Sequence, residues 1–334
     1  MKIVIRVPNW IGDSVMSLPA IQSIKKNFPD SEIWVATREW LKDLFSNNED
    51  LSGIIPLSKD NSISNFYNNI QKLKKEKFNI GILFTNSFSS AFLFFLSKIP
   101  ERWGYANEGR GIFLTRSIKL KEFKKHQVYY YLNLIENLGL KIQNISFSLK
   151  VGKEELNWVE ELLKKLKISS NSLIVGMNPG SFYGSAKNWP VEHFVRLSIK
   201  FIEELDAEVF IFGSKKENLL NNRISEIERE NGKIHNFIGK TTLKELIALI
   251  SKCNLFISND SGPMHIANAL RIPVIAVFGP TDPERTSPFY PPFKIIQKKV
   301  PCAPCKYRDC PVDHKCMKSI KPEEVFEISK ELLE

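Results

Sequence analysis

The chain has 334 residues and a mass of 38.4 kDa, enough for two domains, because single hydrophobic cores rarely extend past about 250 to 300 residues. Its 43% hydrophobic and 25% charged residues exclude a disordered chain, and no run of about 18 apolar residues predicts a membrane span. We find no signal-peptide pattern at the start and therefore expect a cytoplasmic protein. The net charge of +10 favours an anionic partner: nucleic acid, a membrane surface or a phosphorylated small molecule.

In the first half, short apolar runs rich in β-branched residues alternate with segments of helical periodicity. Strands are predicted at residues 2–7, 32–37, 53–57 and 79–85. The helix after the first strand carries Val15, Leu18, Ile21 and Phe28 on one face and ends before Pro29. This alternation is typical of βαβ units with a parallel sheet.

An apolar segment and a basic cluster follow each other at residues 90–125. SAFLFFLSKIP, residues 90–100, is apolar nearly all round, and residues 98–125 hold eight basic residues against three acids. A buried helix is one interpretation of the apolar segment, and a surface that touches a bilayer or lipid is the other. The aromatic spacing of a platform for single-stranded nucleic acid is absent, so we expect no nucleic-acid partner.

A second series of strands and helices begins near residue 172. Strands are predicted at residues 172–177, 208–213, 234–239, 255–258 and 273–279, and a helix at 191–205. We therefore predict an α/β protein with two Rossmann-like domains, each with a parallel sheet, that face each other across a cleft. The predicted division is 1–155, a linker at 156–171, 172–320, and a C-terminal helix at 321–334.

Ligands of open parallel sheets bind where strand carboxyl ends meet helix N-termini, and three loops occupy such places. The first, residues 8–14, brings Gly12 and Asp13 to the start of a helix. The second, NPGSFYGSAKNWP at 178–190, offers glycines, hydroxyls and Lys187, as a phosphate cradle would, although it matches neither the Walker A nor the dinucleotide fingerprint. An ordinary glycine-rich connection with a solvated lysine is the alternative.

The third loop, NDSGPMHIANAL at 259–270, again leads from a strand into a helix. Backbone N–H groups around Gly262 and the positive end of the helix would stabilise a diphosphate. Alternatively, Asp260 or Ser261 only caps the helix and His265 is a packed side chain.

Metal-binding patterns occur only near the C-terminus. No Asp-x-Asp pair suited to a nucleotide-bound divalent ion precedes it, so we predict chemistry that needs no metal and no cofactor. CAPCKYRDCPVDHKC combines a Cys-x-x-Cys pair with two further thiols, which favours either a structural zinc site or free thiols at Cys302, Cys305, Cys310 and Cys316.

Four blocks together carry a resemblance: PNWIGDSVMSLPAI, NPGSFYGSAKNWP, NDSGPMHIANALRIPVIAVFGPTDPERTSP and CAPCKYRDCP. They are similar to the lipopolysaccharide heptosyltransferases, most of all to the heptosyltransferase II branch, and extend over nearly the whole chain. The resemblance implies the GT-B fold and transfer of L-glycero-D-manno-heptose from ADP-heptose to the lipid A-linked inner core. It also implies that the protein acts at the cytoplasmic face of the inner membrane.

The resemblance assigns roles to residues of the three loops. It implies that Asp13 is the catalytic base and that Lys187 holds the donor diphosphate. The remaining implied donor contacts are Gly12, Gly180, Ser181, Ser185, Glu217 on the ribose, Asp260, Ser261, Gly262 and His265. Where the family pattern leads us to expect a basic residue for the acceptor, this chain has Ser89 and Ser90, so we expect Arg102, Arg110 or Arg116 to contact the acceptor.

Other functions stay open at this point. The nearest is heptosyltransferase I, which would act on Kdo-lipid A without the first heptose. A nucleotide-dependent oxidoreductase would fit the Rossmann pattern but lacks the dinucleotide fingerprint. A non-catalytic protein that binds anionic lipid, nucleotide or nucleic acid would explain the charge but would leave Asp13 without a purpose.

Overall fold

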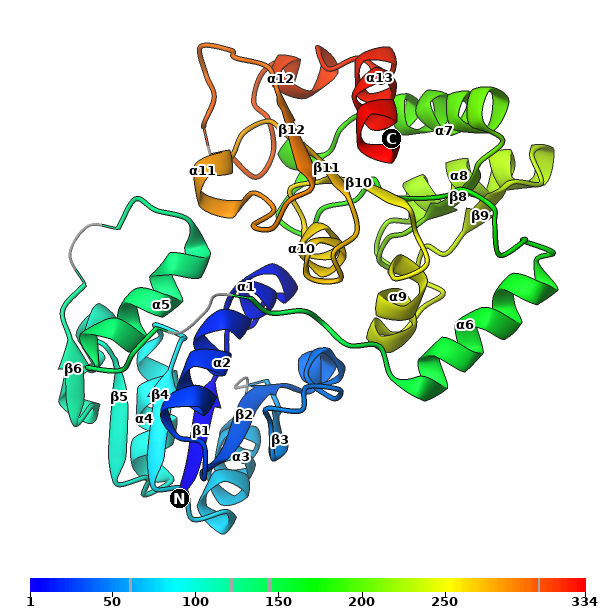
Figure 1. Ribbon diagram of the computed structural model, residues 1–334. Coiled ribbons are helices and arrows are strands. Elements are labelled where there is room, and N and C mark those ends of the chain that lie inside the picture. Colours follow the sequence, from blue (N-terminus) through cyan, green and yellow to red (C-terminus); the bar gives the residue numbers. More distant parts are fainter. Residues whose placement is uncertain (60–61, 121–122, 143–145, 306) are drawn as a thin grey trace. The chain divides into compact units, whose positions relative to one another are not determined.

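The computed structural model describes residues 1–59, 62–120, 123–142, 146–305 and 307–334 (Figure 1). They form two compact units, Met1–Phe147 and Ser148–Glu334, each built on a six-stranded sheet. Every described strand pair is parallel. The predicted α/β class with a parallel sheet in each half is therefore confirmed.

The sheet of the first unit has the strand order β3-β2-β1-β4-β5-β6. Its strands are β1 (Lys2–Arg6), β2 (Glu32–Arg38), β3 (Gly53–Leu57), β4 (Ile80–Leu83), β5 (Glu101–Tyr105) and β6 (Arg116–Ile118). The central strand β4 is wholly apolar and buried, and β1 is apolar and buried at residues 3–5 between Lys2 and Arg6, as expected of strands covered on both faces. β5 and β6 were not predicted, because both are short and rich in charged or small residues.

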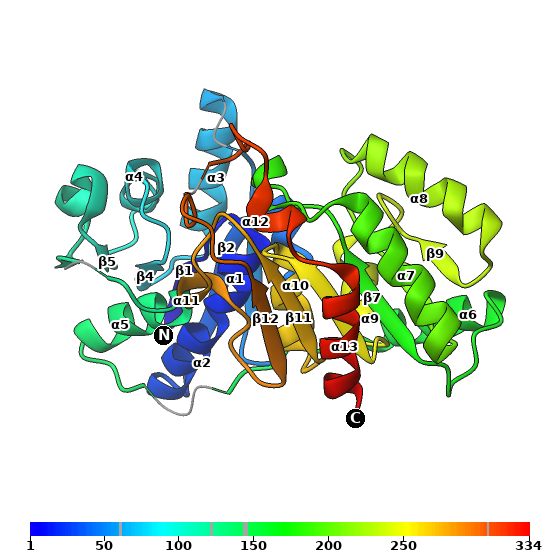
Figure 2. The ribbon, with the colours of Figure 1, turned by 90° about the horizontal axis from the view of Figure 1, so that it is seen from above.

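Helices cover both faces of this sheet. They are α1 (Ile11–Met16), α2 (Leu18–Asn27), η1 (Glu39–Leu44), α3 (Ile63–Lys75), α4 (Phe88–Leu96), η2 (Asn107–Phe113) and α5 (Gln127–Asn137). Figure 2 shows α2 and α5 on one side of the strands, with α3 and α4 on the other. The single helix predicted after β1 is divided at Ser17, because Pro19 in the first turn of α2 lacks the N–H that would continue the ladder.

The sheet of the second unit has the order β12-β11-β10-β7-β8-β9. Its strands are β7 (Ile174–Asn178), β8 (Glu208–Ile211), β9 (Ile234–Asn236), β10 (Leu255–Asn259), β11 (Val274–Phe278) and β12 (Phe293–Gln297). β10 and β7 are neighbours, so the two loops that follow them lie at one edge of the sheet. The edge strand β12 was not predicted, because Lys294 interrupts its short apolar run.

Helices of the second unit also lie on both faces of its sheet. They are α6 (Lys153–Lys165), η3 (Ser185–Lys187), α7 (Val191–Leu205), α8 (Asn218–Glu230), α9 (Leu243–Ile250), α10 (Gly262–Ala269), α11 (Pro283–Thr286), α12 (Lys315–Lys318) and α13 (Pro322–Leu333). α7 and α13 pack side by side through Phe201 and Phe326, whose ring centroids are 5.1 Å apart. Both rings belong to a core shared with Met177, Ile211 and Ile257 of the strands.

The division between the units falls between Phe147 and Ser148, earlier than the predicted boundary at residue 155. The Leu149 N–H donates to the Ala269 carbonyl (3.0 Å), which attaches the chain to the second unit before α6 begins. α6 in turn pairs with α9 and the residues after it through Glu155–Lys244 (3.0 Å) and Glu160–Lys252 (2.7 Å). The predicted linker, 156–171, is thus part of the second unit.

Candidate functional site

In the first unit, Asp13 lies in the first turn of α1, directly beyond the carboxyl end of β1. The buried Ser14 hydroxyl donates to the Pro8 carbonyl (3.0 Å), and the Ser14 N–H donates to Trp10 (2.9 Å), so the loop before Asp13 is fixed. The helix start favours an ionised carboxylate at this position. Asp13 is half-buried.

Tyr131, on α5, is a partner of Asp13 that we did not predict. Its hydroxyl donates to Asp13 Oδ1 at 3.4 Å and accepts from Gln127 (3.2 Å). Burial, and then the nearby Asp13 charge, raise the pKa of the Tyr131 phenol well above its ordinary value. Tyr131 therefore stays protonated and orients one carboxylate oxygen of Asp13. The run of tyrosines at 129–131 was the signal in the sequence.

Arg110, for which an acceptor role is predicted, lies inside the first unit. Its side chain is completely buried, and its guanidinium donates to the carbonyls of Thr85 and Tyr105, the latter at 2.8 Å. Burial lowers the pKa of Arg110 to about 10, against smaller opposing effects of Tyr130 and Glu108. We therefore assign Arg110 to holding the carboxyl end of β4 and the end of β5 together.

Arg102 and Arg116 also have partners within the protein. Arg102 donates from Nε to the Phe113 carbonyl (2.5 Å) and from Nη1 to the Ile99 carbonyl (2.5 Å). The exposed Arg116 guanidinium lies over the Trp103 ring, 4.4 Å from its centroid. An acceptor role stays a prediction for these two residues, and only Arg116 is exposed.

Arg110→Met is expected to lower the free energy of unfolding by about 2 to 4 kcal/mol, because buried carbonyls lose a charged donor. Arg116→Met removes a charge from the surface and should change the free energy of unfolding by no more than about 0.5 kcal/mol. Urea unfolding followed by circular dichroism measures both. A stable Arg110→Met protein with a raised KM for the acceptor would restore the original assignment.

In the second unit, two asparagine side chains join the predicted donor loops. Asn259 Nδ2, at the end of β10, donates to the Pro179 carbonyl (2.5 Å), and its Oδ1 accepts from the Trp189 N–H (3.1 Å). Asn178 Nδ2, at the end of β7, donates to Ser261 Oγ (3.1 Å). These bonds are buried or partly so, and they fix the two loops as one surface.

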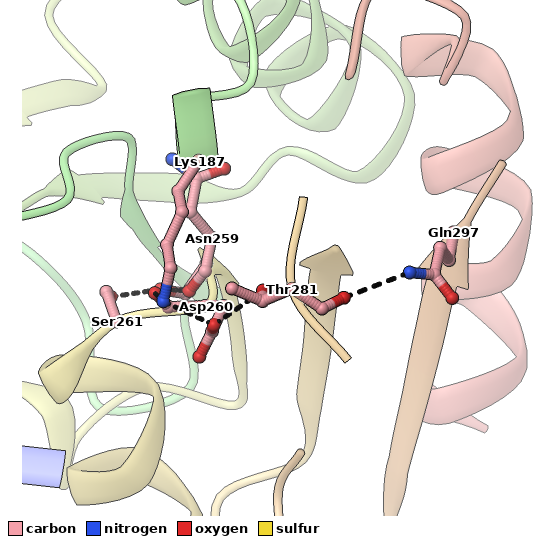
Figure 3. A network of polar contacts seen from close by, with 7 residues as sticks. Lys187, Asn259, Asp260, Ser261, Thr281 and Gln297 are labelled. Atoms are coloured by element: carbon pink, nitrogen blue, oxygen red, sulfur yellow. Dashed lines mark hydrogen bonds and ion pairs between the residues drawn. The ribbon is translucent and has the colours of Figure 1, made fainter. Parts of the chain in front are cut away.

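Lys187 and Asp260 form the centre of this surface (Figure 3). Lys187 Nζ lies 2.5 Å from Asp260 Oδ2, and the two side chains are only 13% and 6% exposed. Asp260 Oδ2 also accepts from the Thr281 hydroxyl (2.8 Å), and the Thr281 carbonyl accepts from Gln297 (3.2 Å). The Lys187 ammonium lies 4.8 Å from the centroid of the Tyr183 ring. The result is a positioned cation beside two strand ends.

The remaining predicted donor residues lie on the same edge of the sheet. Ser261 precedes α10, whose first turn contains Gly262 and the buried His265. Gly180 packs against Glu217: a Cβ at Gly180 would lie 1.5 Å from Glu217 Oε1, so a larger residue there would displace the Glu217 carboxylate. Glu217 Oε2 accepts from the Ser214 N–H (2.5 Å), and Ser181 is half-exposed. Their donor roles stay predictions.

The cysteine-rich segment, residues 302–316, packs on the loop that carries Lys187. The Ala186 N–H donates to the Arg308 carbonyl (2.9 Å), His314 Nε2 lies 2.7 Å from the Ala186 carbonyl, and the Ser185 hydroxyl donates to Asp309 (2.7 Å). A Cβ at Gly184 would lie 2.2 Å from the Arg308 carbonyl oxygen. Ser185, predicted to contact the donor, therefore has a structural partner.

The thiols of this segment are free in the structure: Cys302 is exposed, Cys305 and Cys310 are half-buried, and Cys316 is buried. Burial, followed by the proximity of the other three cysteines, raises the pKa of the Cys316 thiol. Within the part of the chain that the structure describes, no group of three or more His, Cys, Asp or Glu side chains is arranged to hold a metal ion. The zinc hypothesis thus gains no support from the described geometry.

Comparisons with known proteins find similar proteins that align with nearly the whole chain. The family model for glycosyltransferase family 9 (heptosyltransferase) matches residues 67–316. Lipooligosaccharide heptosyltransferase 2 of Campylobacter jejuni serotype O:2 is 34% identical over 339 residues, which cover 100% of this chain and 98% of that protein. The solved structure of Escherichia coli ADP-heptose lps heptosyltransferase II is 27% identical with a TM-score of 0.85, covering 100% of this chain and 98% of that one.

A second solved structure extends the likeness in fold. The glycosyl transferase family 9 protein of Veillonella parvula is 23% identical to this chain, with a TM-score of 0.87. The alignment covers 99% of this chain and 97% of that protein. The architecture of both units is therefore shared along their whole length.

Proposed function

Because the chain belongs to glycosyltransferase family 9, the heptosyltransferases, and is therefore a glycosyltransferase, we propose that it transfers L-glycero-D-manno-heptose from ADP-heptose to the inner core of lipopolysaccharide. The acceptor that we propose is heptosyl-Kdo-lipid A, because relatives named heptosyltransferase 2 align with nearly the whole chain. No cofactor is needed for this reaction.

The observation that carries the proposal is the Lys187 ammonium, positioned by Asp260 beside the carboxyl ends of β7 and β10. A diphosphate that approaches this edge meets one ordered cation and the N-terminal N–H groups of α10. Charge that develops on departing ADP is stabilised by donors already in place, a contribution of about 3 to 4 kcal/mol per donor.

The reaction we propose is a single inverting displacement. The acceptor hydroxyl oxygen attacks the anomeric carbon, the bond between that carbon and the diphosphate oxygen breaks, and the Asp13 carboxylate takes the hydroxyl proton. An aspartate is a weak base toward an alcohol, but it suffices when proton transfer follows bond formation and the hydroxyl turns acidic only in the transition state. Tyr131 keeps the carboxylate oriented during this transfer.

We propose that catalysis needs no divalent metal, because the sequence lacks an Asp-x-Asp pair and Lys187 supplies the charge instead. Turnover in excess chelator should equal turnover without it. Activity that is lost with chelator and restored by magnesium would contradict this part of the proposal.

For its location, we propose the cytoplasmic face of the inner membrane, where the protein would bind peripherally. In the described part of the chain, no helix has the length and hydrophobicity to cross a bilayer. Calorimetric titration with ADP, NAD and short oligonucleotides tests the proposed class of ligand. Binding of ADP alone is expected, whereas preferential binding of NAD or of oligonucleotides would contradict a sugar transferase.

A further inference from the structure

Helix α4 and the turn η2 present a group of apolar side chains to solvent. We call this group the aromatic patch: Phe88, Phe92, Phe95 and Leu96 of α4, with Ile112 and Phe113 of η2. Phe88 and Phe95 are each 45% exposed, Leu96 is 36% exposed and Ile112 is 78% exposed. Contiguous apolar surface of this kind is uncommon on soluble proteins unless it binds a partner.

The patch is ordered by contacts among its own rings. The Phe113 ring centroid lies 5.1 Å from that of Phe88, 5.2 Å from Phe92 and 5.3 Å from Phe95. Phe92 also stacks on Phe66 of α3 at 6.0 Å. The exposed rings are therefore held in place as one continuous surface.

The exposed face of α4 is apolar although its opposite face already fills the core. Ser90, Ala91, Leu93 and Phe94 are buried against the sheet. The exposed residues 88, 95 and 96 and the half-buried residue 92 follow helical spacing on the other side, and no residue of α4 is charged. Core packing therefore explains why one face of α4 is apolar. The apolar side chains on its other face suit a second apolar environment.

Charged side chains follow α4 in the sequence. Lys98, Lys119 and Arg116 beside Trp103 are exposed, and so are the acids Glu101 and Glu108. The Arg102 guanidinium lies over the Phe95 ring, 5.4 Å from its centroid. Of the other charged residues noted in this region, Lys121 and Glu122 lie outside the described residues. Apolar side chains flanked by cations match a bilayer with anionic head groups, which attracts each surface cation by about 1 kcal/mol.

The position of the patch suits a lipid-linked acceptor. Phe88 begins α4 shortly after β4, and β4 pairs in parallel with β1. Asp13 follows β1 at the same, carboxyl edge of the sheet. The Phe88 end of the patch thus lies at the same edge of the sheet as the proposed base.

We propose that the aromatic patch is the surface by which the first unit docks on a membrane that contains anionic lipids. The inference depends on the proposed function only where it invokes a lipid-linked acceptor. The exposure, the ring contacts and the charges are independent of that function.

Flotation with vesicles of phosphatidylcholine, with and without phosphatidylglycerol, tests the inference on the full chain. The wild type should bind the mixed vesicles, and Phe95→Ser/Ile112→Ser should bind about tenfold more weakly because half-exposed apolar groups no longer insert. Lys98→Gln/Lys119→Gln should lose about fivefold per residue, on the anionic vesicles alone. The matched control is Ile142→Ser/Ile295→Ser, at side chains outside the patch that are 36% and 38% exposed. It should bind as the wild type does.

Transfer of heptose to a deacylated acceptor, without vesicles, separates this inference from the proposed function. All four proteins should show equal turnover there. Wild-type vesicle binding that survives in the patch variants would overturn the docking surface, whatever the enzymatic result. The docking surface would also be overturned if the wild type formed a dimer that the patch variants abolish, while these variants bind vesicles as the wild type does. Loss of vesicle binding in the patch variants of a protein without transferase activity would instead overturn only the proposed function.

Discussion

Asp13→Asn is expected to lower kcat for heptosyl transfer by about 10²- to 10⁴-fold, the range typical of a lost general base. The amide is nearly isosteric and can still accept the Tyr131 hydrogen bond, so the local structure should persist. ADP affinity should stay unchanged, because we assign Asp13 to the acceptor hydroxyl and not to the diphosphate. Single-turnover kinetics together with ADP calorimetry measures the two effects separately.

The matched control is Asp30→Asn, an exposed aspartate beyond the end of α2. It should leave both kcat and ADP affinity at wild-type values. Tyr131→Phe should lower kcat less than Asp13→Asn does, since it removes the orienting contact but keeps the base. Full activity of Asp13→Asn would contradict the proposed role of Asp13 as the catalytic base.

Lys187→Ala is expected to weaken ADP binding by about tenfold and to lower kcat by about 10²- to 10³-fold. The loss of ADP affinity is smaller than the loss of kcat because the Lys187 ammonium already pairs with Asp260 in the free protein. That ion pair competes with the ligand. Lys187→Arg keeps the positive charge and should recover part of both losses. Calorimetry and initial rates on the same preparations measure the effects.

The fold needs a separate control in this experiment, because Asp260 is 6% exposed and loses its cation when Lys187 is removed. The Thr281 hydroxyl remains as its donor, so we expect a lower melting temperature but a folded protein. Lys233→Ala, at a half-buried lysine that pairs with the exposed Asp206, should change neither ADP affinity nor kcat. Equal ADP affinity of the wild type and Lys187→Ala would contradict the proposal that the loop at 178–190 binds the diphosphate.

The sequence predicted the elements that local pattern determines. β1, β2, β3, β7 and β10 were found within a few residues, because buried parallel strands read as short apolar runs bounded by polar loops. The same rule led to Asp13, Lys187 and Asp260, since side chains that follow such strands lie at one edge of the sheet. The edge strands β6 and β12 were missed because they are short and contain charged residues, whereas the edge strands β3 and β9 were found.

Contacts between distant residues could not be predicted in the same way. Nothing local to Asn259 indicates that its amide holds Pro179 and Trp189, and nothing local to Lys187 indicates its ion pair with Asp260. Arg110 shows the reverse problem. It stands in a basic cluster and looks like a surface cation, yet the fold buries it on backbone carbonyls.

Mass spectrometry of the product tests the central claim most directly. The wild-type protein is incubated with ADP-heptose and, separately, with Kdo-lipid A or heptosyl-Kdo-lipid A, in the presence of chelator. We predict one added heptose on heptosyl-Kdo-lipid A, none on Kdo-lipid A, and no product with Asp13→Asn. Addition to Kdo-lipid A alone would identify the other acceptor, and the absence of product from both would contradict heptosyl transfer to the inner core.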